Sequence, residues 1–187
     1  MDVIPDSFYS YYVRIMKIRK IKIEKSDLIA EYLPANYSDA FECVFPTEKK
    51  ISADDIMVAF WTNNPKWVDR LFALRDWLVK PFGLQSGKDR NEELFENAIK
   101  NSDSYRFVKV AAKSDNETII NADDSHLKMY FSVKTNEVND KQQKVVVSTI
   151  VHFHNWLGRT YFALIYPFHY FIVSSMIKHS LKRLSGK

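Results

Sequence analysis

Three histidines, an arginine and a tyrosine in the last third of the chain are the residues whose types and spacing favour chemistry. His152 and His154 are two positions apart, Arg159 and Tyr161 follow shortly after, and His169 lies further along the same apolar stretch. An imidazole can bind a metal or transfer a proton, and a guanidinium binds carboxylates and phosphates. Because polar groups are costly to bury without partners, these five residues are predicted either to line a ligand-binding site or to be hydrogen-bonded scaffolding.

A zinc site is one alternative for the histidines. His152 and His154 share one face of a predicted strand, and His126 on another strand is a third candidate ligand. In the simpler interpretation, His154 and Asn155 end the strand by hydrogen bonding to loop backbone. We favour the simpler interpretation and predict no metal, because the chain contains no HExxH or CxxC pattern.

Arg159 and His169 also have two interpretations each. Arg159 directly follows Gly158 and is expected to hold a ligand carboxylate or phosphate, or to pair with one of three carboxylates: Asp39, Asp123 or Asp124. His169 belongs to a stripe at helical spacing that is expected to face the sheet, formed by Tyr161, Ile165, His169, Ile172 and Met176. A core histidine bonded to a backbone carbonyl is the favoured interpretation of His169, and contact with a ligand is the alternative.

The composition indicates one globular domain in a reducing compartment. The 187 residues are 46% hydrophobic and 14% aromatic, which is enough for one substantial core. Cys43 is the only cysteine, which excludes intrachain disulfides, and the first residues lack a secretory signal pattern, so a cytoplasmic location is expected. The four glycines cannot form a dinucleotide fingerprint, and no cofactor is predicted.

The uncharged run from Thr160 to Ile177 could be a membrane span or a buried helix, because its 18 residues would extend over roughly 27 Å as a helix. Six Phe or Tyr residues are spread along the run rather than gathered at its ends, and Pro167 and His169 lie near its middle. These features favour a buried helix of a soluble domain over a membrane span.

The first thirty residues form a basic arm. The net charge of +4 is mild and partly local to this arm, where Arg14, Lys17, Arg19, Lys20, Lys22 and Lys25 cluster. Such a cluster can meet phosphates or anionic lipid, but Ile21 and Ile23 alternate with charged residues. We therefore favour a solvated edge strand, whose lysines discourage aggregation, and predict no nucleic-acid partner.

Hydrophobic periodicity and turn residues predict the order of the elements. A strand at 37–45 precedes a helix that begins at Ser52 with a capping box, and a second helix begins at Asn64 and Pro65 and ends at Pro81 and Gly83. The apolar stripe of that second helix, expected to face the core, is Trp67, Leu71, Leu74 and Leu78. A short helix at 92–100 follows, then an antiparallel meander at 105–112, 117–122, 126–134 and 144–154, and a long helix from Gly158 to about Leu184.

Several short strings together resemble a bacterial family of domains of unknown function, the group numbered 2867 (DUF2867). They are Asp39-Ala40-Phe41, Trp67-Val68, Leu74-Arg75, Pro81-Phe82-Gly83-Leu84, His126-Leu127, His152-Phe153-His154-Asn155, Gly158-Arg159, Tyr161-Phe162 and Pro167-Phe168-His169. The resemblance extends from about Leu33 to Ile177. Members resemble the START and Bet v 1 (SRPBCC) superfamily, which implies a helix-grip fold: a curved antiparallel sheet around a long C-terminal helix. That agrees with the α+β element order, although the sequence shows fewer clear strands than the usual seven of that fold.

The predicted organisation is a basic arm at 1–30 and one helix-grip domain at 31–187. We expect the domain to bind a small apolar or amphipathic ligand between sheet and C-terminal helix, with His152, His154, Arg159, Tyr161 and His169 as polar contacts. One alternative is a cyclase-like or hydrolytic enzyme that uses a cavity histidine, with or without zinc. The other is an interaction module that forms a homodimer through the apolar helix.

Overall fold

The computed structural model describes residues 16–79 and 91–185, with side chains described for 16–74 and 91–185. The helices are η1 (Leu28–Tyr32), α2 (Ala53–Thr62), α3 (Lys66–Val79), α4 (Glu92–Lys100) and α5 (Trp156–Ser185). The strands are β1 (Arg19–Ile21), β2 (Tyr37–Pro46), β3 (Ser104–Tyr105), β4 (Val108–Lys113), β5 (Glu117–Asp123), β6 (Leu127–Asn139) and β7 (Gln142–Phe153). The α+β element order is the predicted one.

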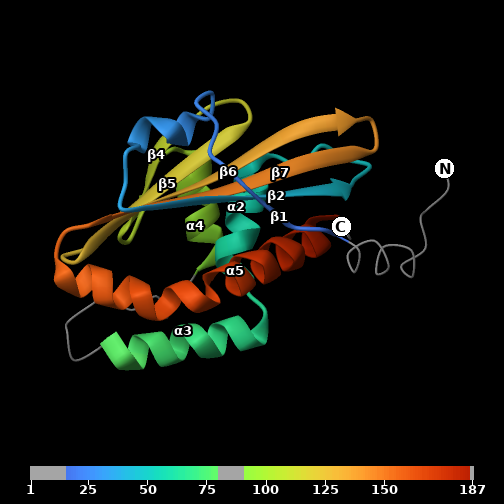
Figure 1. Cartoon of the computed structure of the whole chain (residues 1–187). Coiled ribbons are helices and arrows are strands. Elements are labelled where there is room, and N and C mark those ends of the chain that lie inside the picture. The colour runs from blue at the N-terminus through green and yellow to red at the C-terminus, as the bar shows by residue number, and fades with distance from the viewer. Residues whose placement is uncertain (1–15, 80–90, 186–187) are drawn as a thin grey trace.

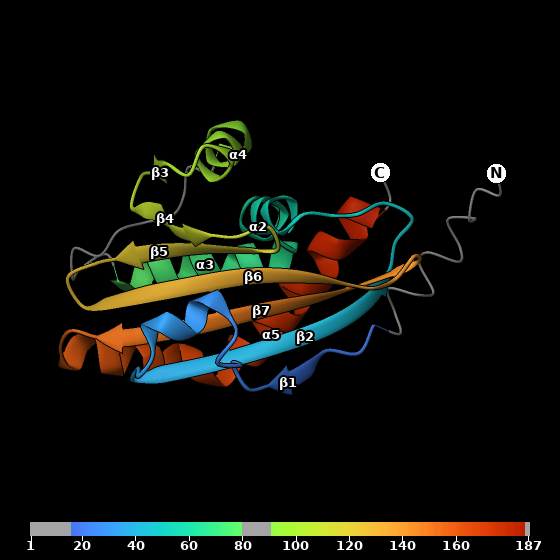
Figure 2. The same ribbon diagram turned by 90° about the horizontal axis from the view of Figure 1, so that it is seen from above.

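The described residues form one open sheet of seven strands in the order β1-β2-β7-β6-β5-β4-β3, and all neighbouring strands are antiparallel. The strand expected at 105–112 is divided into β3 and β4, which brings the number of strands among the described residues to seven. β1 lies at one edge, so the edge-strand interpretation of the basic arm is confirmed for Arg19–Ile21. Helices α2, α3 and α5 lie on one side of the sheet, and η1 lies on the other (Figures 1 and 2).

Burial on both faces of the sheet explains why β7 is apolar on both sides. Val145 and Val147 belong to the main core, which also contains residues of α2 and α5. Ile150 points to the opposite face and packs with Ile29 of η1 and Ile119 of β5. The short helix η1 therefore covers the part of the sheet that the long helices leave open.

Helix α2 begins as predicted, and helix α3 differs from prediction in the face that it buries. Ser52 and Asp55 form the capping box of α2. In α3, Val68 is fully buried and Phe72 packs against the core, whereas Trp67 and Leu74 are 42% and 51% exposed. The predicted stripe was therefore wrong by one position, and the Pro81 and Gly83 prediction lies outside the described residues.

Helix α5 has two unlike halves. Its C-terminal half enters the core through Met176, Ile177 and Leu181, each at most 2% exposed, and each such side chain contributes roughly 1.5–3 kcal/mol of burial free energy. Its N-terminal half leaves several large apolar side chains in solvent, including Leu164 and Phe171 at 60% and 64% exposure. The prediction of a buried helix is thus wrong for the N-terminal half.

Among the described residues, α5 is one helix that is long and apolar enough to cross a membrane, judged by length and composition alone. Only 17% of its apolar 18-residue window is buried. The core helix of a soluble domain can satisfy the same length and hydropathy criteria, so this finding by itself does not identify a span.

The start of α5 is fixed by a close contact with the turn between β5 and β6. Asn155 caps the helix, because its side-chain oxygen accepts a hydrogen bond from the Gly158 backbone N–H at 3.2 Å. A Cβ atom at Gly158 would lie 2.1 Å from the backbone oxygen of His126. Glycine is therefore required here for close approach of helix and turn.

Replacing Gly158 by alanine is expected to destabilise the protein by about 1–3 kcal/mol, because the backbone of the turn must move. Helix propensity alone predicts the opposite sign, a gain of roughly 1 kcal/mol. Urea unfolding of Gly158→Ala measures the difference, with the exposed Thr160→Ala on the same helix as control. A Gly158→Ala variant as stable as the natural protein contradicts the contact.

Candidate functional site

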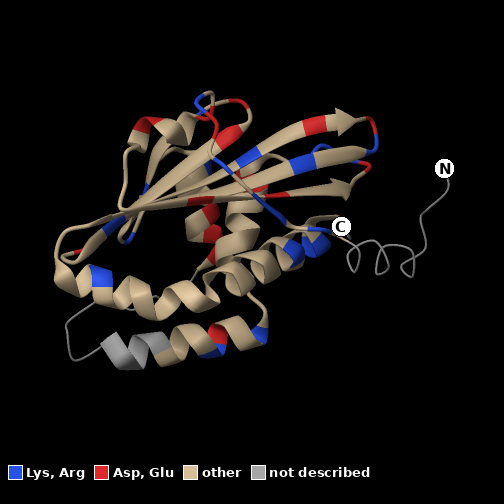
Figure 3. Ribbon diagram, viewed as in Figure 1, with Lys and Arg blue, Asp and Glu red and all other residues tan. Residues whose placement is uncertain are grey.

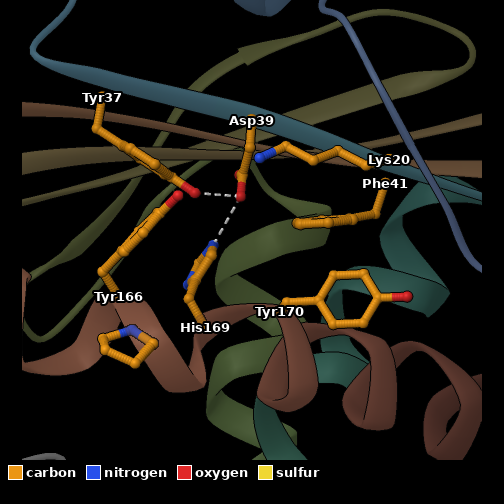
Figure 4. Close-up of a pocket in the computed structure, with 8 residues that line it drawn as sticks. Lys20, Tyr37, Asp39, Phe41, Tyr166, His169 and Tyr170 are labelled. Carbon is orange, nitrogen blue, oxygen red and sulfur yellow. Dashed lines mark hydrogen bonds and ion pairs between the residues drawn. The ribbon is translucent and has the colours of Figure 1, made fainter.

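A pocket of about 200 Å³ lies between the edge of the sheet and the N-terminal half of α5 (Figure 4). Strands β1 and β2 supply one wall, and α5 supplies the other. Its lining residues are Lys20, Tyr37, Asp39, Phe41, Tyr166, Pro167, His169 and Tyr170. Polar side chains thus meet aromatic rings in one small depression.

Strand and helix periodicity place these side chains in the pocket. Tyr37, Asp39 and Phe41 alternate along β2, so all three point to the face that α5 covers. On α5, Tyr166, His169 and Tyr170 recur at spacings of three and four and turn toward β2 (Figure 4). The pairing of β2 with β7 fixes Asp39 opposite Thr149, at the third of ten paired positions from the start of β2.

Asp39 is the centre of the site. Its side chain is fully buried, and one carboxylate oxygen, Oδ2, accepts a hydrogen bond from the Tyr37 hydroxyl at 2.5 Å. The same oxygen lies 3.2 Å from Nε2 of His169, but the geometry is not that of a hydrogen bond, so this contact is electrostatic. The other oxygen, Oδ1, is buried and has no hydrogen-bond partner among the described residues.

Tyr37 is held in its neutral form. Burial, and then the hydrogen bond to the Asp39 carboxylate, raise the pKa of the Tyr37 hydroxyl well above its usual range. The phenol therefore keeps its proton and remains a donor to Asp39. Its ring also packs against three aromatic side chains of α5, Phe162, Tyr166 and His169.

Lys20 brings a positive charge to the same pocket from the edge strand β1 (Figure 4). A buried carboxylate needs compensating charge or hydrogen bonds, and Tyr37, His169 and Lys20 all approach Asp39 from different elements. The arrangement favours a ligand that carries a hydrogen-bond donor and an apolar body, because the polar cluster is flanked by Phe41 and Tyr170.

Of the five residues predicted from sequence, His169 lies in this pocket and the others lie elsewhere. His152 donates from Nε2 to the backbone oxygen of Tyr32 at 3.1 Å, beneath η1. His154 is 2.8 Å from Asp123 and half-exposed, and this hydrogen bond is the largest cause that lowers the pKa of the Asp123 carboxyl. Arg159 is exposed near the start of α5.

Tyr161 packs edge to face against the buried His126, with ring centroids 5.2 Å apart. The three carboxylates proposed as partners of Arg159 contact histidines instead: Asp39 contacts His169, Asp123 contacts His154, and Asp124 lies 3.6 Å from His126. Among the described residues, His169 is therefore the one member of the predicted set that lines the pocket. Asn155 binds the backbone oxygen of Ser125 at 3.0 Å, as the simpler interpretation of the strand end expected.

His152 and His154 do not meet His126 in a metal site. Within residues 16–74 and 91–185, no group of three or more His, Cys, Asp or Glu side chains has an arrangement that could hold a metal ion. His152 turns toward η1, and His154, just after β7, contacts Asp123 at the end of β5, two strands away in the sheet.

Sequence reasoning missed Tyr37 and Asp39 as site residues. A usable signal was present: an aspartate in the middle of an apolar strand, two positions from a tyrosine and from Phe41. A strand carboxylate between buried neighbours needs a partner from another element, and His169 on the predicted inward stripe of α5 was the available one.

The chain folds as an α+β domain with an open antiparallel sheet and a long C-terminal helix, and the pocket lies between the sheet and that helix. A family model described as "Protein of unknown function (DUF2867)" matches residues 32–176, and the chain belongs to that family. A comparison with curated proteins gave no match. Both Asp39 and His169, which meet in the pocket, lie within the matched range.

Cys43 follows Asp39 and Phe41 on the same face of β2, where it is 1% exposed. Burial raises the pKa of its thiol to about 11. We expect this sole cysteine to resist the thiol reagent DTNB in the folded protein at pH 8, and to react fully in guanidinium chloride. Absorbance at 412 nm follows the reaction, and rapid labelling of the folded protein contradicts the packing of β2 against α5.

Proposed function

We propose that the chain is a binding protein for a small amphipathic molecule, held in the pocket between β2 and α5. Oδ1 of Asp39 carries the proposal, because a buried carboxylate oxygen without a partner is rare and calls for a donor. A hydroxyl or amine on the ligand would supply that donor. Aromatic rings of Phe41, Tyr166 and Tyr170 would contact its apolar part.

The size of the pocket limits the ligand. Pockets for drug-sized molecules usually measure about 300–1,000 Å³. At about 200 Å³, this pocket suits a headgroup or a single ring rather than a whole large molecule. The pocket is open at the surface, so an attached chain can extend along α5.

We also propose that the fold is a helix-grip fold of the START and Bet v 1 type. The antiparallel sheet and long C-terminal helix are its coarse features. The ligand position differs from a central cavity, because Met176, Ile177 and Leu181 fill the space beneath the sheet along the C-terminal half of α5. The proposed site lies at the edge instead. We propose in addition that the protein is bacterial and cytoplasmic.

An enzyme is the second candidate, and the contact between His169 and Asp39 is the observation that favours it. A carboxylate 3.2 Å from one imidazole nitrogen can orient the ring, which leaves the other nitrogen available to exchange a proton with a substrate. Tyr37, held neutral, would serve as a fixed donor to the carboxylate.

Native mass spectrometry of the protein purified from its own host tests binding directly. We expect a bound small molecule that denaturing extraction releases. Asp39→Asn and His169→Ala should lower its affinity roughly tenfold to a hundredfold, because a hydrogen bond to a charged group contributes about 1.5–3 kcal/mol. His154→Ala, a histidine replacement outside the pocket, is the matched control and should retain the ligand.

The same variants distinguish the two candidate functions. If His169→Ala keeps its affinity for the extracted molecule but loses its conversion to product, the site is catalytic. If all variants and the natural protein emerge without any bound molecule, or if His154→Ala loses the ligand as readily as Asp39→Asn, the pocket is not the binding site.

A further inference from the structure

The side of α5 that faces away from the sheet carries a row of large, exposed apolar side chains. At 100° per residue, Trp156, Leu164, Phe168 and Phe171 lie within about 120° of one another around the helix axis. Their exposed fractions are 73%, 60%, 53% and 64%. Large side chains with such exposure normally lie scattered on a soluble protein, and a contiguous row marks an interaction surface.

The charges on the same helix are all of one sign. Helix α5 contains no Asp or Glu in its 30 residues. Lys178 and Lys182 lie about two and three turns beyond Phe171, at angular positions within the range of the apolar row, and Lys182 is exposed whereas Lys178 is half-buried. Figure 3 shows the basic residues near both ends of α5 and no acidic residue along it. This pattern of apolar residues followed by lysines is complementary to an anionic partner with an apolar interior.

We propose that this outward face of α5, from Trp156 to Phe171 with Lys178 and Lys182, docks onto an anionic lipid bilayer surface. Trp and Phe side chains would enter the boundary between headgroups and acyl chains, and the lysines would contact the headgroups. The apolar part is 16 residues long, so about 24 Å of helix would lie in the plane of the membrane.

A surface orientation fits the contacts of α5 better than a membrane span. Its C-terminal half is bound in the core by Met176, Ile177 and Leu181, and its middle is joined to β2 by the contact of His169 with Asp39. A span would have to separate all of these contacts and take the His169 imidazole into hydrocarbon. A surface helix keeps them and buries only the side that the protein leaves exposed.

A second copy of the chain is a poorer partner for this face. In a twofold dimer the same surface meets itself, and α5 offers no carboxylate to the two lysines of the other copy. Burying Lys178 and Lys182 without opposite charge is unfavourable, whereas anionic headgroups supply that charge.

Membrane docking of the outward face of α5 does not depend on the proposed ligand, although this face adjoins the Asp39 pocket. Tyr166 and Tyr170 line the Asp39 pocket and are themselves 52% and 44% exposed beside the apolar row. A docked protein would therefore have its pocket opening next to the bilayer.

Vesicle flotation of the full chain tests the docking surface. We expect the protein to float with vesicles of phosphatidylcholine and phosphatidylglycerol at 7:3, and to bind pure phosphatidylcholine at least about tenfold more weakly. Phe168→Ser combined with Phe171→Ser should reduce binding to the mixed vesicles by about tenfold or more. Val138→Ser, a 50% exposed apolar residue in the β6–β7 hairpin, is the matched control and should bind normally.

A second pair of variants tests the charge contribution without touching the apolar row. Lys178→Gln with Lys182→Gln should weaken binding to the mixed vesicles about tenfold and leave the weak binding to phosphatidylcholine unchanged. Three outcomes overturn the proposal: no flotation with mixed vesicles, equal binding of the serine variant and the natural protein, or concentration-dependent dimerisation that the serine variant abolishes without any vesicle binding. Loss of pocket ligand in Asp39→Asn with normal flotation would separate this inference from the proposed function.

Discussion

The buried carboxylate of Asp39 is the main constraint on how the N-terminal half of α5 packs against the sheet. A charge with no exposed surface must be compensated by neighbouring donors and cations, and those neighbours come from separate elements. Tyr37 donates along the same strand, and His169 reaches across from α5. The carboxylate thereby joins the N-terminal half of α5 to the sheet, alongside the ring contacts that Tyr37 and Phe41 make with Phe162, Tyr166 and Tyr170.

This polar attachment explains how α5 can be both a core helix and a surface helix. Near its start, Gly158 lies against the backbone of His126, and its last turns are bound by apolar burial around Leu181. Between these two attachments the helix touches the sheet through one side only. The opposite side is free to carry Phe168 and Phe171 into solvent at no cost to the core.

Much of the fold could be predicted from the sequence because its local signals agree. The capping box at Ser52, the alternation in β2 and the apolar centre of β7 each specified an element that the structure contains. The strand β3 was hard to predict as a separate element because its two residues carry almost no periodicity, whereas the alternation of Ile21 and Ile23 with charged residues indicated the edge strand that contains β1. The buried face of α3 was misjudged because Val68 and Phe72 have the same four-residue spacing as Trp67 and Leu71.

The site was only partly predictable, since it depends on which polar residues of distant elements meet. Helical spacing placed His169 on the inward stripe of α5, and the position of Asp39 within an apolar strand marked it as needing a partner, but neither local pattern specified that these two residues meet. His152 and His154 drew attention by their spacing, although strand ends bind loops and neighbouring side chains as readily as ligands. The family strings that contain Asp39 and His169 are 130 positions apart, and only pairing of β2 with β7 and packing of α5 on that pair bring them together.

Hydropathy likewise cannot tell which half of an apolar helix is covered, because coverage is set by how far the sheet and α2 extend, and here they cover the C-terminal half.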